Sequence, residues 1–428
     1  MTENNPNIDV DIAIAGGGPT GLAMACALAG TGLRILLVDA GKEVITFTEL
    51  AEQVALPPFD PRVSALTVTS QALLDDLGVW ESIRAARVCP YHEMHVWDGE
   101  GTGSIHFSAA EIHADSLGYI VENNLVSAAL LQQARLSENL TLVQEDKVAS
   151  VERALSEQPA EGAGGQNRKE SDLISLTLES GTVVSARLLI GADGGNSFVR
   201  EQAGFSIREW DYGHQAIVTT VKTEKAHDYT AWQRFTRSGP LAFLPLYLPG
   251  QAPADQCFSS IVWSCVTQEA EGLLALEDEA FRRQLSEAFE YRLGNVVESD
   301  RRYSFPLWQR HATDYVQDQI ALIGDAAHTI HPLAGQGVNL GFADVRVLSD
   351  VITAAMAKGE DFASHQVLSR YQRRRKGPNL GMMAAMEGFR HLFGSDNLAL
   401  KWLRNNGLKM TDNLPVVKQQ LIRQAMGL

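Results

Sequence analysis

The N-terminal segment combines a strand pattern, a glycine-rich turn, a helix pattern and a second strand, and few folds accommodate this order. Residues 8–15 form an apolar run, and the turn Gly-Gly-Gly-Pro-Thr-Gly follows at 16–21. Small and apolar side chains at 22–29 are typical of a closely packed helix, and a second apolar run at 34–39 ends in an acid. A G-x-G-x-x-G turn inside such a βαβ unit is typical of Rossmann-like dinucleotide-binding domains. We therefore predict an α/β fold.

Each residue of this first motif has an expected part in binding. Gly16 allows the tight turn, Gly18 lets the backbone approach a pyrophosphate, and Gly21 allows helix and strand to come close. Asp39 lies 18 residues after Gly21, near the spacing of about 20 expected for a carboxylate that binds the adenosine ribose. NAD and FAD share the ADP half, so this motif alone leaves both cofactors possible.

A second glycine-rich stretch lies near the other end of the chain. Gly324 and Asp325 follow the apolar run 320–323, so a carboxylate is expected at the end of a strand. There it can accept hydrogen bonds from sugar or chain hydroxyls of a cofactor. Gly335 and Gly337 precede a predicted helix, whose first N–H groups suit anionic oxygens. The stretch therefore predicts a phosphorylated, planar ligand.

A third motif lies between these two. Residues 186–191 form an apolar run, and Asp193 and Gly194 follow before a helix pattern. An Asp-Gly pair after a strand is by itself a common turn. The pair is informative because it lies between the other two motifs, so that the chain has the order G-x-G-x-x-G, Asp-Gly, Gly-Asp.

With this order of motifs, the chain resembles the class A flavoprotein aromatic hydroxylases, whose fold is that of p-hydroxybenzoate hydroxylase. Segments 60–66, 77–80, 91–98 and 376–389, together with the Gly-Asp stretch, are similar to the ubiquinone-biosynthesis hydroxylases, the UbiH/UbiF/VisC group. The similarity extends over nearly the whole chain. It implies a Rossmann-like FAD-binding domain of p-hydroxybenzoate hydroxylase type, an interleaved β-sheet substrate domain and C-terminal helices.

The resemblance also implies an activity. The expected enzyme is an FAD-dependent monooxygenase that hydroxylates a polyprenyl-phenol in ubiquinone biosynthesis, through reduced flavin and a C4a-hydroperoxide. NAD(P)H is the transient reductant and O2 the co-substrate. Dioxygen reacts slowly with closed-shell aromatic rings, and a flavin supplies the single-electron chemistry that the protein lacks. The sequence has no second G-x-G-x-x-G for a resident nicotinamide, so a protein electron donor stays a possible alternative.

The same resemblance assigns roles to further residues. Arg62 and Asn124 match family positions near the FAD, and a surface salt bridge or a turn is the alternative role for each. The Asp193–Gly194 turn is expected to serve both FAD and NAD(P)H, and the Gly324–Asp325 turn to hold the riboflavin part. Residues 334–339, with Asn339, are expected to direct backbone groups at the flavin.

Two histidines and a proline flank the expected flavin loop. His331 and Pro332 are the catalytic candidates beside the ring. For His328 and His331, a structural hydrogen bond is the competing interpretation.

Composition fits an intracellular enzyme. The 428 residues contain 45% hydrophobic side chains, enough for two or three domains. The four cysteines form no C-x-x-C pair, so neither disulfides nor zinc is expected, and no metal site is predicted. The N-terminus lacks a secretory pattern, and no stretch reaches the roughly 20 apolar residues of a membrane span.

Charge is distributed unevenly along the chain. Residues 366–428 contain eleven Lys and Arg against three Asp and Glu, whereas the whole chain carries a net charge of −16. An acidic body argues against nucleic acid as a partner. Basic and apolar residues alternate near the C-terminus, which favours contact with an anionic lipid surface; a solvated helix face is the alternative. We expect a cytoplasmic homo-oligomer, peripheral on the inner face of the cytoplasmic membrane, with other ubiquinone-biosynthesis proteins as possible partners.

The patterns also suggest domain limits. The FAD-binding domain is expected to be discontinuous, the substrate domain to carry alternating and aromatic strand patterns, and the chain end to be helical. The expected limits are 1–85, 112–205 and 300–360 for the FAD-binding domain, 86–111 and 206–299 for the substrate-binding sheet, and 361–428 for the C-terminal helical region.

Other functions remain open at this point. A halogenase of the same fold would carry W-x-W-x-I-P, which the sequence lacks. A prenyl-lipid reductase would saturate chains instead of using oxygen. The enzyme could also hydroxylate another phenolic substrate, or the chain could be a non-catalytic flavin-binding scaffold in a quinone-synthesis complex.

Overall fold

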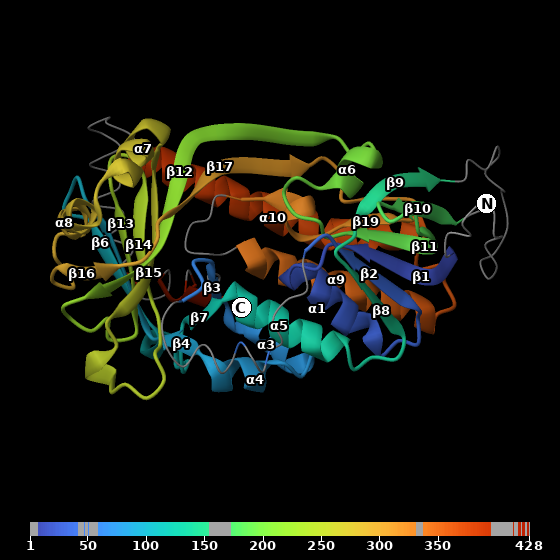
Figure 1. Cartoon of the computed structure of the whole chain (residues 1–428), viewed down its shortest axis with the longest axis horizontal. Helices are drawn as coiled ribbons and strands as arrows, with labels where there is room; N and C mark the ends of the chain where they lie inside the picture. The colour runs from blue at the N-terminus through green and yellow to red at the C-terminus, as the bar shows by residue number, and fades with distance from the viewer. Residues whose placement is uncertain are drawn as a thin grey trace.

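The computed structural model contains two regions built on different sheets and joined by long strands (Figure 1). The region with the first sheet lies on the right of Figure 1 and contains most of the long helices, and the region with the second sheet lies on the left. The structure describes residues 7–41, 47, 50, 59–153, 173–330, 337–394, 414, 418–420, 422–423 and 426–427.

The first region is built on an eight-stranded sheet with the order β18-β19-β11-β1-β2-β8, to which β10 and β9 are added beside β11. Five of its strands run parallel, as the βαβ pattern predicts. Its central strands are nearly continuous apolar runs, which is typical of a parallel sheet covered on both faces. The strands are β1 (Asn7–Ala15), β2 (Ile35–Asp39), β8 (Leu140–Gln144), β9 (Val148–Arg153), β10 (Ile174–Leu178), β11 (Val183–Gly191), β18 (Val316–Gln317) and β19 (Ile320–Leu322).

Helices pack on this sheet and complete the largest core. Helix α1 contacts both α5 and α9, and α9 contacts α10. Ala23 and Ala25 in α1 are fully buried, since small side chains let this helix approach its neighbours closely. The helices of this region are α1 (Pro19–Ala29), α3 (Val68–Asp76), α4 (Trp80–Ala86), α5 (Asn123–Ala134), α6 (Phe198–Gln202), α9 (Gly337–Ala357) and α10 (His365–Gly394).

The second region is built on a nine-stranded sheet with the order β20-β17-β12-β15-β14-β13-β5-β6, with β16 beside β12. It is antiparallel except for the pair β13–β5. Helices α7 (Thr267–Ala275) and α8 (Asp278–Ala288) belong to this region. The strands are β5 (Glu93–Asp98), β6 (Ser104–Ser108), β12 (Ile207–Thr223), β13 (Thr230–Phe235), β14 (Pro240–Pro245), β15 (Phe258–Val266), β16 (Val296–Ser299), β17 (Tyr303–Ala312) and β20 (His328–Thr329).

Two paired strands connect the regions. Strand β12 pairs with β17 from Ile207 to Val218, with a register shift between Asp211 and Gln215. Such an irregularity bends a strand and increases its twist, and Gly213 within it has φ +63°. Strand β12 can therefore run beside α6 and then enter the second sheet, as Figure 1 shows along the top of the molecule.

Alternating side chains divide the second sheet into two faces. Phe243 belongs to a cluster with Phe281 and Phe289 of the α8 side, whereas its neighbours Ala242 and Leu244 belong to a separate cluster. That second cluster includes residues of the small sheet β3-β7-β4, formed by β3 (Val63–Leu66), β7 (Gly118–Glu122) and β4 (Val88–Tyr91). The inner face of the nine-stranded sheet therefore looks toward the first region.

Two strands within the range 300–360, which is expected to belong to the FAD-binding domain, lie in the nine-stranded sheet. Strand β17 pairs with β12, and β20 pairs with β17. The apolar pattern of β17 does not distinguish one sheet from another, because pairing partners are set by tertiary contacts. The remaining domain limits stay predictions. In the part of the chain that the structure describes, no helix has the length and low charge that a bilayer crossing would need.

Candidate functional site

The first glycine-rich turn follows β1 and is shaped by close backbone contacts. Gly16 has φ +107°, and a Cβ there would lie 2.4 Å from the carbonyl oxygen of Ala192. A Cβ at Gly21 would lie 1.9 Å from the carbonyl oxygen of Gly16. At Gly18, in contrast, a Cβ would meet nothing within 4 Å. Gly16 and Gly21 are therefore required by packing, and Gly18 borders open space at the start of α1.

Asp39 stands beside this turn at the end of β2. A Cβ at Gly17 would lie 2.7 Å from Cβ and Cγ of Asp39, and Asp39 itself is half-buried. The carboxylate therefore lies against the same turn that the sequence predicts to hold a pyrophosphate.

The Asp-Gly turn follows β11, the neighbour of β1. The carboxylate of Asp193 accepts hydrogen bonds from Ser197 Oγ and, at 3.0 Å, from the Val199 backbone N–H, so it caps α6. Gly194 has φ +82°, and a Cβ there would meet nothing within 4 Å. Both oxygens of Asp193 are used within the protein, and the open space lies at Gly194. A direct bond from Asp193 to a cofactor stays a prediction.

The Gly-Asp turn follows β19, the other neighbour of β11. Gly324 has φ +59°, and a Cβ there would contact Thr20 at 3.1 Å. A Cβ at Gly341 in α9 would lie 2.5 Å from Thr20 Oγ1. Thr20, in the first motif, thus fits against the third. Sequence reasoning missed Thr20, because nothing in its local pattern shows this packing.

The three turns meet at one edge of the eight-stranded sheet. They follow β1, β11 and β19, which are adjacent and parallel. The buried Arg200 strengthens the link, because its guanidinium donates to the carbonyl oxygens of Gly195 at 2.8 Å and of Ala326 at 3.0 Å. In open α/β sheets, ligands bind outside the carboxyl ends of the strands, so this edge is the candidate binding site.

Asp325 projects from the third turn into this site. Its side chain has exposed surface although protein surrounds it on most sides, as expected for a group inside a crevice. Desolvation raises the pKa of Asp325 above its ordinary value, with a smaller raising contribution from Asp344, whereas His328 lowers it. The carboxylate is thus available to hydroxyl groups of a ligand.

Asn339 is the third residue of α9, which begins at Gly337. Its Oδ1 accepts from the Thr67 N–H at 3.0 Å, and its Nδ2 donates to the Ala65 carbonyl oxygen at 2.8 Å. The side chain is buried, and it joins α9 to β3. A bond between Asn339 and a cofactor would have to come from its backbone.

Two further predicted residues differ in their surroundings. Arg62 is exposed, and its carbonyl oxygen accepts from the Asn123 N–H at 3.0 Å. Asn124, in the first turn of α5, has a buried Oδ1 without a hydrogen-bond partner among the described residues. A buried acceptor of this kind usually has a partner, so this atom is open to a bound ligand. His331, Pro332 and Gly335 lie outside the described residues.

Comparisons with known proteins agree with this geometry. The FAD binding domain family matches residues 9–383. The 3-demethoxyubiquinol 3-hydroxylase of Escherichia coli is 37% identical, covering 99% of this chain and all of that protein. The ubiquinone hydroxylase UbiL of Rhodospirillum rubrum is 35% identical over 97% of this chain and 89% of its own length. The chain belongs to the FAD-dependent ubiquinone-biosynthesis hydroxylases.

A solved structure shows the same fold. The p-nitrophenol 4-monooxygenase PnpA of Pseudomonas putida superposes with a TM-score of 0.73 at 18% identity, covering 98% of each chain. The hydroxylase described here is thus an FAD-dependent monooxygenase of the class A fold, with O2 and NAD(P)H as the co-substrate and reductant standard for this class. The predicted α/β fold class and the predicted cofactor are confirmed.

The residues of the site fit FAD. Open space at Gly18 lies at the N-terminus of α1, where free N–H groups suit a pyrophosphate. The accessible carboxylate of Asp325 provides a hydrogen-bond acceptor at the third turn, and Asn124 Oδ1 is a buried acceptor without a partner among the described residues.

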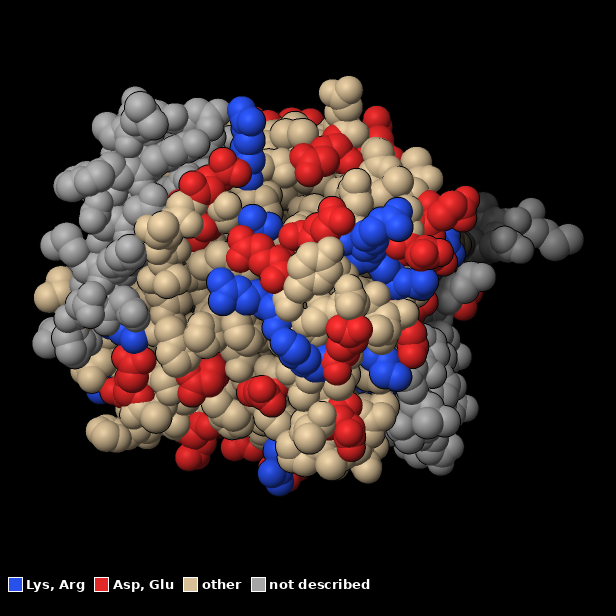
Figure 2. All heavy atoms as spheres, turned by 90° about the vertical axis from the view of Figure 1, so that its left-hand side faces the viewer, with Lys and Arg blue, Asp and Glu red and all other residues tan. Residues whose placement is uncertain are grey.

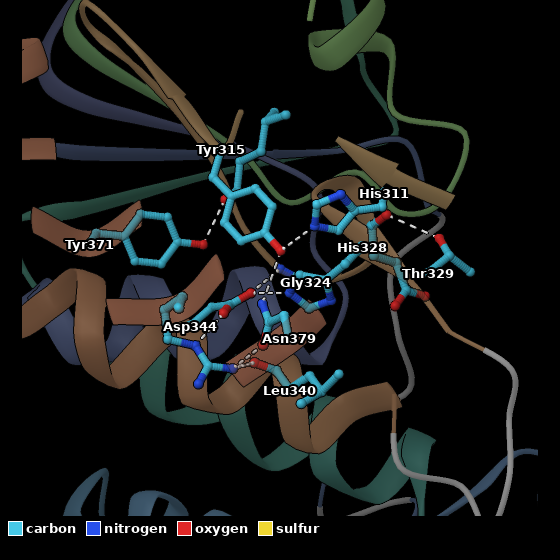
Figure 3. Close-up of polar contacts among 12 residues, drawn as sticks. His311, Tyr315, Gly324, His328, Thr329, Leu340, Asp344, Tyr371 and Asn379 are labelled. Atoms are coloured by element: carbon cyan, nitrogen blue, oxygen red, sulfur yellow. Dashed lines mark hydrogen bonds and ion pairs between the residues drawn. The ribbon is translucent and has the colours of Figure 1, made fainter. Parts of the chain in front are cut away.

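A buried polar network lies behind the third turn of the hydroxylase (Figure 3). Asp344 of α9 has no exposed surface and accepts three hydrogen bonds: from the Gly324 N–H at 3.0 Å, His328 Nε2 at 2.6 Å and Arg375 Nε at 2.7 Å. Burial would raise the pKa of Asp344, but His328 and Arg375 outweigh burial and lower it. Asp344 is therefore an ionised carboxylate.

The network continues from Arg375 to the second sheet. Arg375 donates to Asn379 Oδ1 at 2.7 Å, and Asn379 Nδ2 donates to Tyr315 Oη at 3.3 Å. Tyr315 Oη lies 3.0 Å from His311 Nε2. Desolvation, with the nearby His328, lowers the pKa of His311 to about 4, so this imidazole is neutral near pH 7 and accepts from the Tyr315 hydroxyl.

This network contains the structural hydrogen bond expected for His328, changes the interpretation of Arg375 and adds residues that sequence reasoning missed. His328 has the structural hydrogen-bond role, since its buried ring bonds to Asp344. Arg375 belongs to the basic segment 366–428, for which contact with a lipid surface is expected, but its side chain is buried. An acid at Asp344 on the apolar face of a helix was the available signal, because a buried carboxylate requires a partner.

Proposed function

We propose that this chain hydroxylates the aromatic ring of a polyprenyl-phenol in ubiquinone biosynthesis. The observation that carries the proposal is the meeting of three glycine-containing turns at one sheet edge, in a chain of the hydroxylase family. Relatives named for hydroxylation of ubiquinone precursors match this chain over nearly their whole length. The substrate class follows from those names and from the apolar surroundings described below.

The proposed placement of FAD follows the three turns. Its pyrophosphate would lie at Gly18 and its adenosine ribose at Asp39, because Asp39 lies against Gly17, the residue before Gly18. The riboflavin part would lie at Asp325 and at the start of α9. Further contacts would come from the exposed Arg62 and from the unpartnered oxygen of Asn124.

FAD held at these turns and reduced by NAD(P)H would supply the chemistry that activates O2, with one oxygen atom transferred to an electron-rich ring carbon and the other released as water. The protein must hold the phenol beside the flavin and exclude water, which would otherwise divert the oxygen to hydrogen peroxide. An apolar cluster between the second sheet and the small sheet supports this role. Its buried members are Phe59, Ala65, Cys89, Ile120, Ala231, Ala242, Leu244, Leu246 and Leu248.

Acid–base catalysis is assigned to none of the described histidines. His328 is engaged by Asp344, and His311 is engaged by Tyr315. His331 and Pro332 remain the proposed residues beside the flavin. An electron-rich phenol reacts with an activated oxygen without a dedicated base, so the proposed chemistry depends chiefly on position.

We further propose that the enzyme is a cytoplasmic homo-oligomer that contacts the inner face of the cytoplasmic membrane and other ubiquinone-biosynthesis proteins. On the face in Figure 2, basic and acidic side chains are interspersed, and no extended basic surface forms among the described residues there. In α10, Arg370 pairs with Glu360 and Arg375 with Asp344, which leaves the exposed Arg373 and Arg374 for lipid headgroups.

Vesicle sedimentation tests this membrane contact. The wild-type protein should pellet with vesicles that contain anionic lipid and less with neutral ones. An R373E/R374E double variant should lose most of the difference, because charge reversal removes the attraction. Equal sedimentation of both proteins would contradict the contact, and sedimentation velocity without vesicles would report the oligomer.

A deletion strain tests the proposed function directly. Without the gene, a polyprenyl-phenol that lacks one ring oxygen should accumulate, and its mass and fragmentation identify the missing position. The wild-type gene should restore the product, whereas G18D should not, provided that both proteins are present at equal levels. Restoration by G18D would favour a non-catalytic scaffold. An unchanged quinone pool in the deletion strain would favour a different phenolic substrate.

A further inference from the structure

A buried ion pair lies behind the turn that presents Asp325 to the cofactor site. Asp344 accepts from the Gly324 N–H, and its partner Arg375 has a side chain that is 9% exposed. Figure 3 shows Asp344 beside Gly324 of the turn and His328. None of the proposed FAD contacts uses this pair, so its role is unassigned.

The pair fixes the geometry of the turn. Gly324 adopts φ +59°, and its N–H donates to the Asp344 carboxylate. His328 and Arg375 also bond to this carboxylate and hold it in place. Hydrogen bonds to an ionised acceptor are about twice as strong as neutral ones. Tyr371 adds a second link, because its hydroxyl donates to the Leu322 carbonyl oxygen at 2.8 Å. Helix α10 therefore determines where the end of β19 and the turn lie.

The pair also sets the charge behind the site. Asp344 accepts a hydrogen bond from the N–H of Gly324, the residue before Asp325, so its charge lies close behind the crevice. Arg375 balances that charge inside the protein, where screening by water is weak. Reduction adds electrons to a flavin, and a nearby negative charge opposes this step while a positive charge favours it.

We infer that Asp344 and Arg375 are positioning residues that hold the Gly324–Asp325 turn for FAD and tune the reduction potential of the bound flavin. The inference rests on the proposed FAD placement. It predicts two separable effects. Variants of either residue weaken FAD binding about tenfold, the scale expected for losing one charge-assisted hydrogen bond. Their effects on the potential have opposite signs.

Redox titration of the purified holoenzyme tests the inference, with FAD affinity measured by reconstitution of apoprotein. D344N removes a negative charge and should raise the midpoint potential, whereas R375Q leaves Asp344 unbalanced and should lower it. The double variant D344N/R375Q is neutral and should return close to the wild-type potential.

Two controls separate charge from structure. R375K keeps the charge and should keep the potential. R234Q removes an arginine from β13, where Arg234 pairs with Glu290 at 3.1 Å in the second region, and should leave the potential unchanged.

A merely structural pair would shift both single variants in the same direction, and this result, or no shift in either, would overturn the inference. If D344N fails to fold, R375Q against R375K decides, since equal potentials would again overturn it. A wild-type protein that takes up no FAD would refute the proposed function instead.

Discussion

The two sheets of this molecule carry function in different places. In the eight-stranded parallel sheet, the functional groups lie in turns beyond the strand ends, where glycines and acids stand out in the sequence. In the nine-stranded sheet, they lie on one face of antiparallel strands, where every second residue contributes. The functional residues of a turn are consecutive in the sequence and can be recognised there. Those of a sheet face come from many strands and are separated in the sequence.

The comparison extends to how each region is stabilised. The first region has one large core that includes sheet and helices, with the polar network around Asp344 behind the site. The second region separates its outer core, with Phe243 and Phe289, from an inner cluster that borders the proposed substrate. Binding of FAD should therefore respond to changes in the first region, and stability of the sheet to changes in the second.

Gly18→Asp should produce the largest effect and act on the first region alone. A carboxylate at this position would enter the open space at the N-terminus of α1 and repel the pyrophosphate, so bound FAD should be lost. The fold should persist, because a Cβ there meets no atom within 4 Å. The ratio of flavin to protein absorbance and circular dichroism would report the two quantities. As a matched control, Gly21→Ala should also impair folding, because its Cβ would clash with Gly16.

Phe243→Ala should show the reverse pattern. Phe243 has no exposed surface and stacks on Phe289 with 3.8 Å between ring centroids. Its truncation should cost about 3–5 kcal/mol in the free energy of unfolding, measured by urea denaturation. At low temperature the folded protein should still bind FAD at the wild-type ratio. Loss of FAD in proportion to the loss of stability would mean that the two regions behave as one unit.

The comparison also explains what the sequence could predict. The βαβ unit, the strand ends and the start of α9 were predicted, because local patterns encode them directly. Contacts between distant segments were not. The fit of Thr20 against Gly341 and the burial of Arg375 depend on pairings over long separations. The pairing of β17 with β12 depends on tertiary contacts for the same reason.

The residues of the candidate site also fall into those that local patterns could predict and those that depend on distant contacts. Gly16, Gly18 and Gly21 have surroundings that match their expected parts in the turn. Asp193 and Asn339, chosen from the resemblance, have side chains engaged by protein partners. A motif indicates that a residue is needed, but its hydrogen-bond partners follow only from the packed structure.

His311 lies on β17, which joins the regions, and it should make stability depend on acidity. Its pKa is lowered to about 4 in the folded protein, below about 6.5 in an unfolded chain. The unfolded state therefore binds the proton first as pH falls. Stability should be complete above about pH 6.5, fall by up to about 3 kcal/mol toward pH 4, and level off below.

Urea denaturation at about pH 7.5 and pH 4.5 would measure this effect of acidity. His311→Gln should reduce the difference between the two conditions, since glutamine can still accept from Tyr315. His227 provides the counterpart in the second region, because burial lowers its pKa as well. If wild type and His311→Gln lost the same free energy of unfolding between the two pH values, groups other than His311 would govern acid unfolding.

Arg84→Met should have the smallest effect, with little or no change in the free energy of unfolding. Arg84 pairs with Glu81 on α4 at 2.8 Å, but both side chains are more than 60% exposed, so water screens the attraction.

Three residues further along, Arg87 pairs with Glu122 at 2.6 Å, and both side chains are almost fully buried. Arg87→Met would leave a buried carboxylate uncompensated, a loss of about 3–5 kcal/mol. Urea denaturation of both variants would separate burial from charge pairing as the source of stability, and equal losses would mean that the ion pair itself, irrespective of its surroundings, stabilises this region.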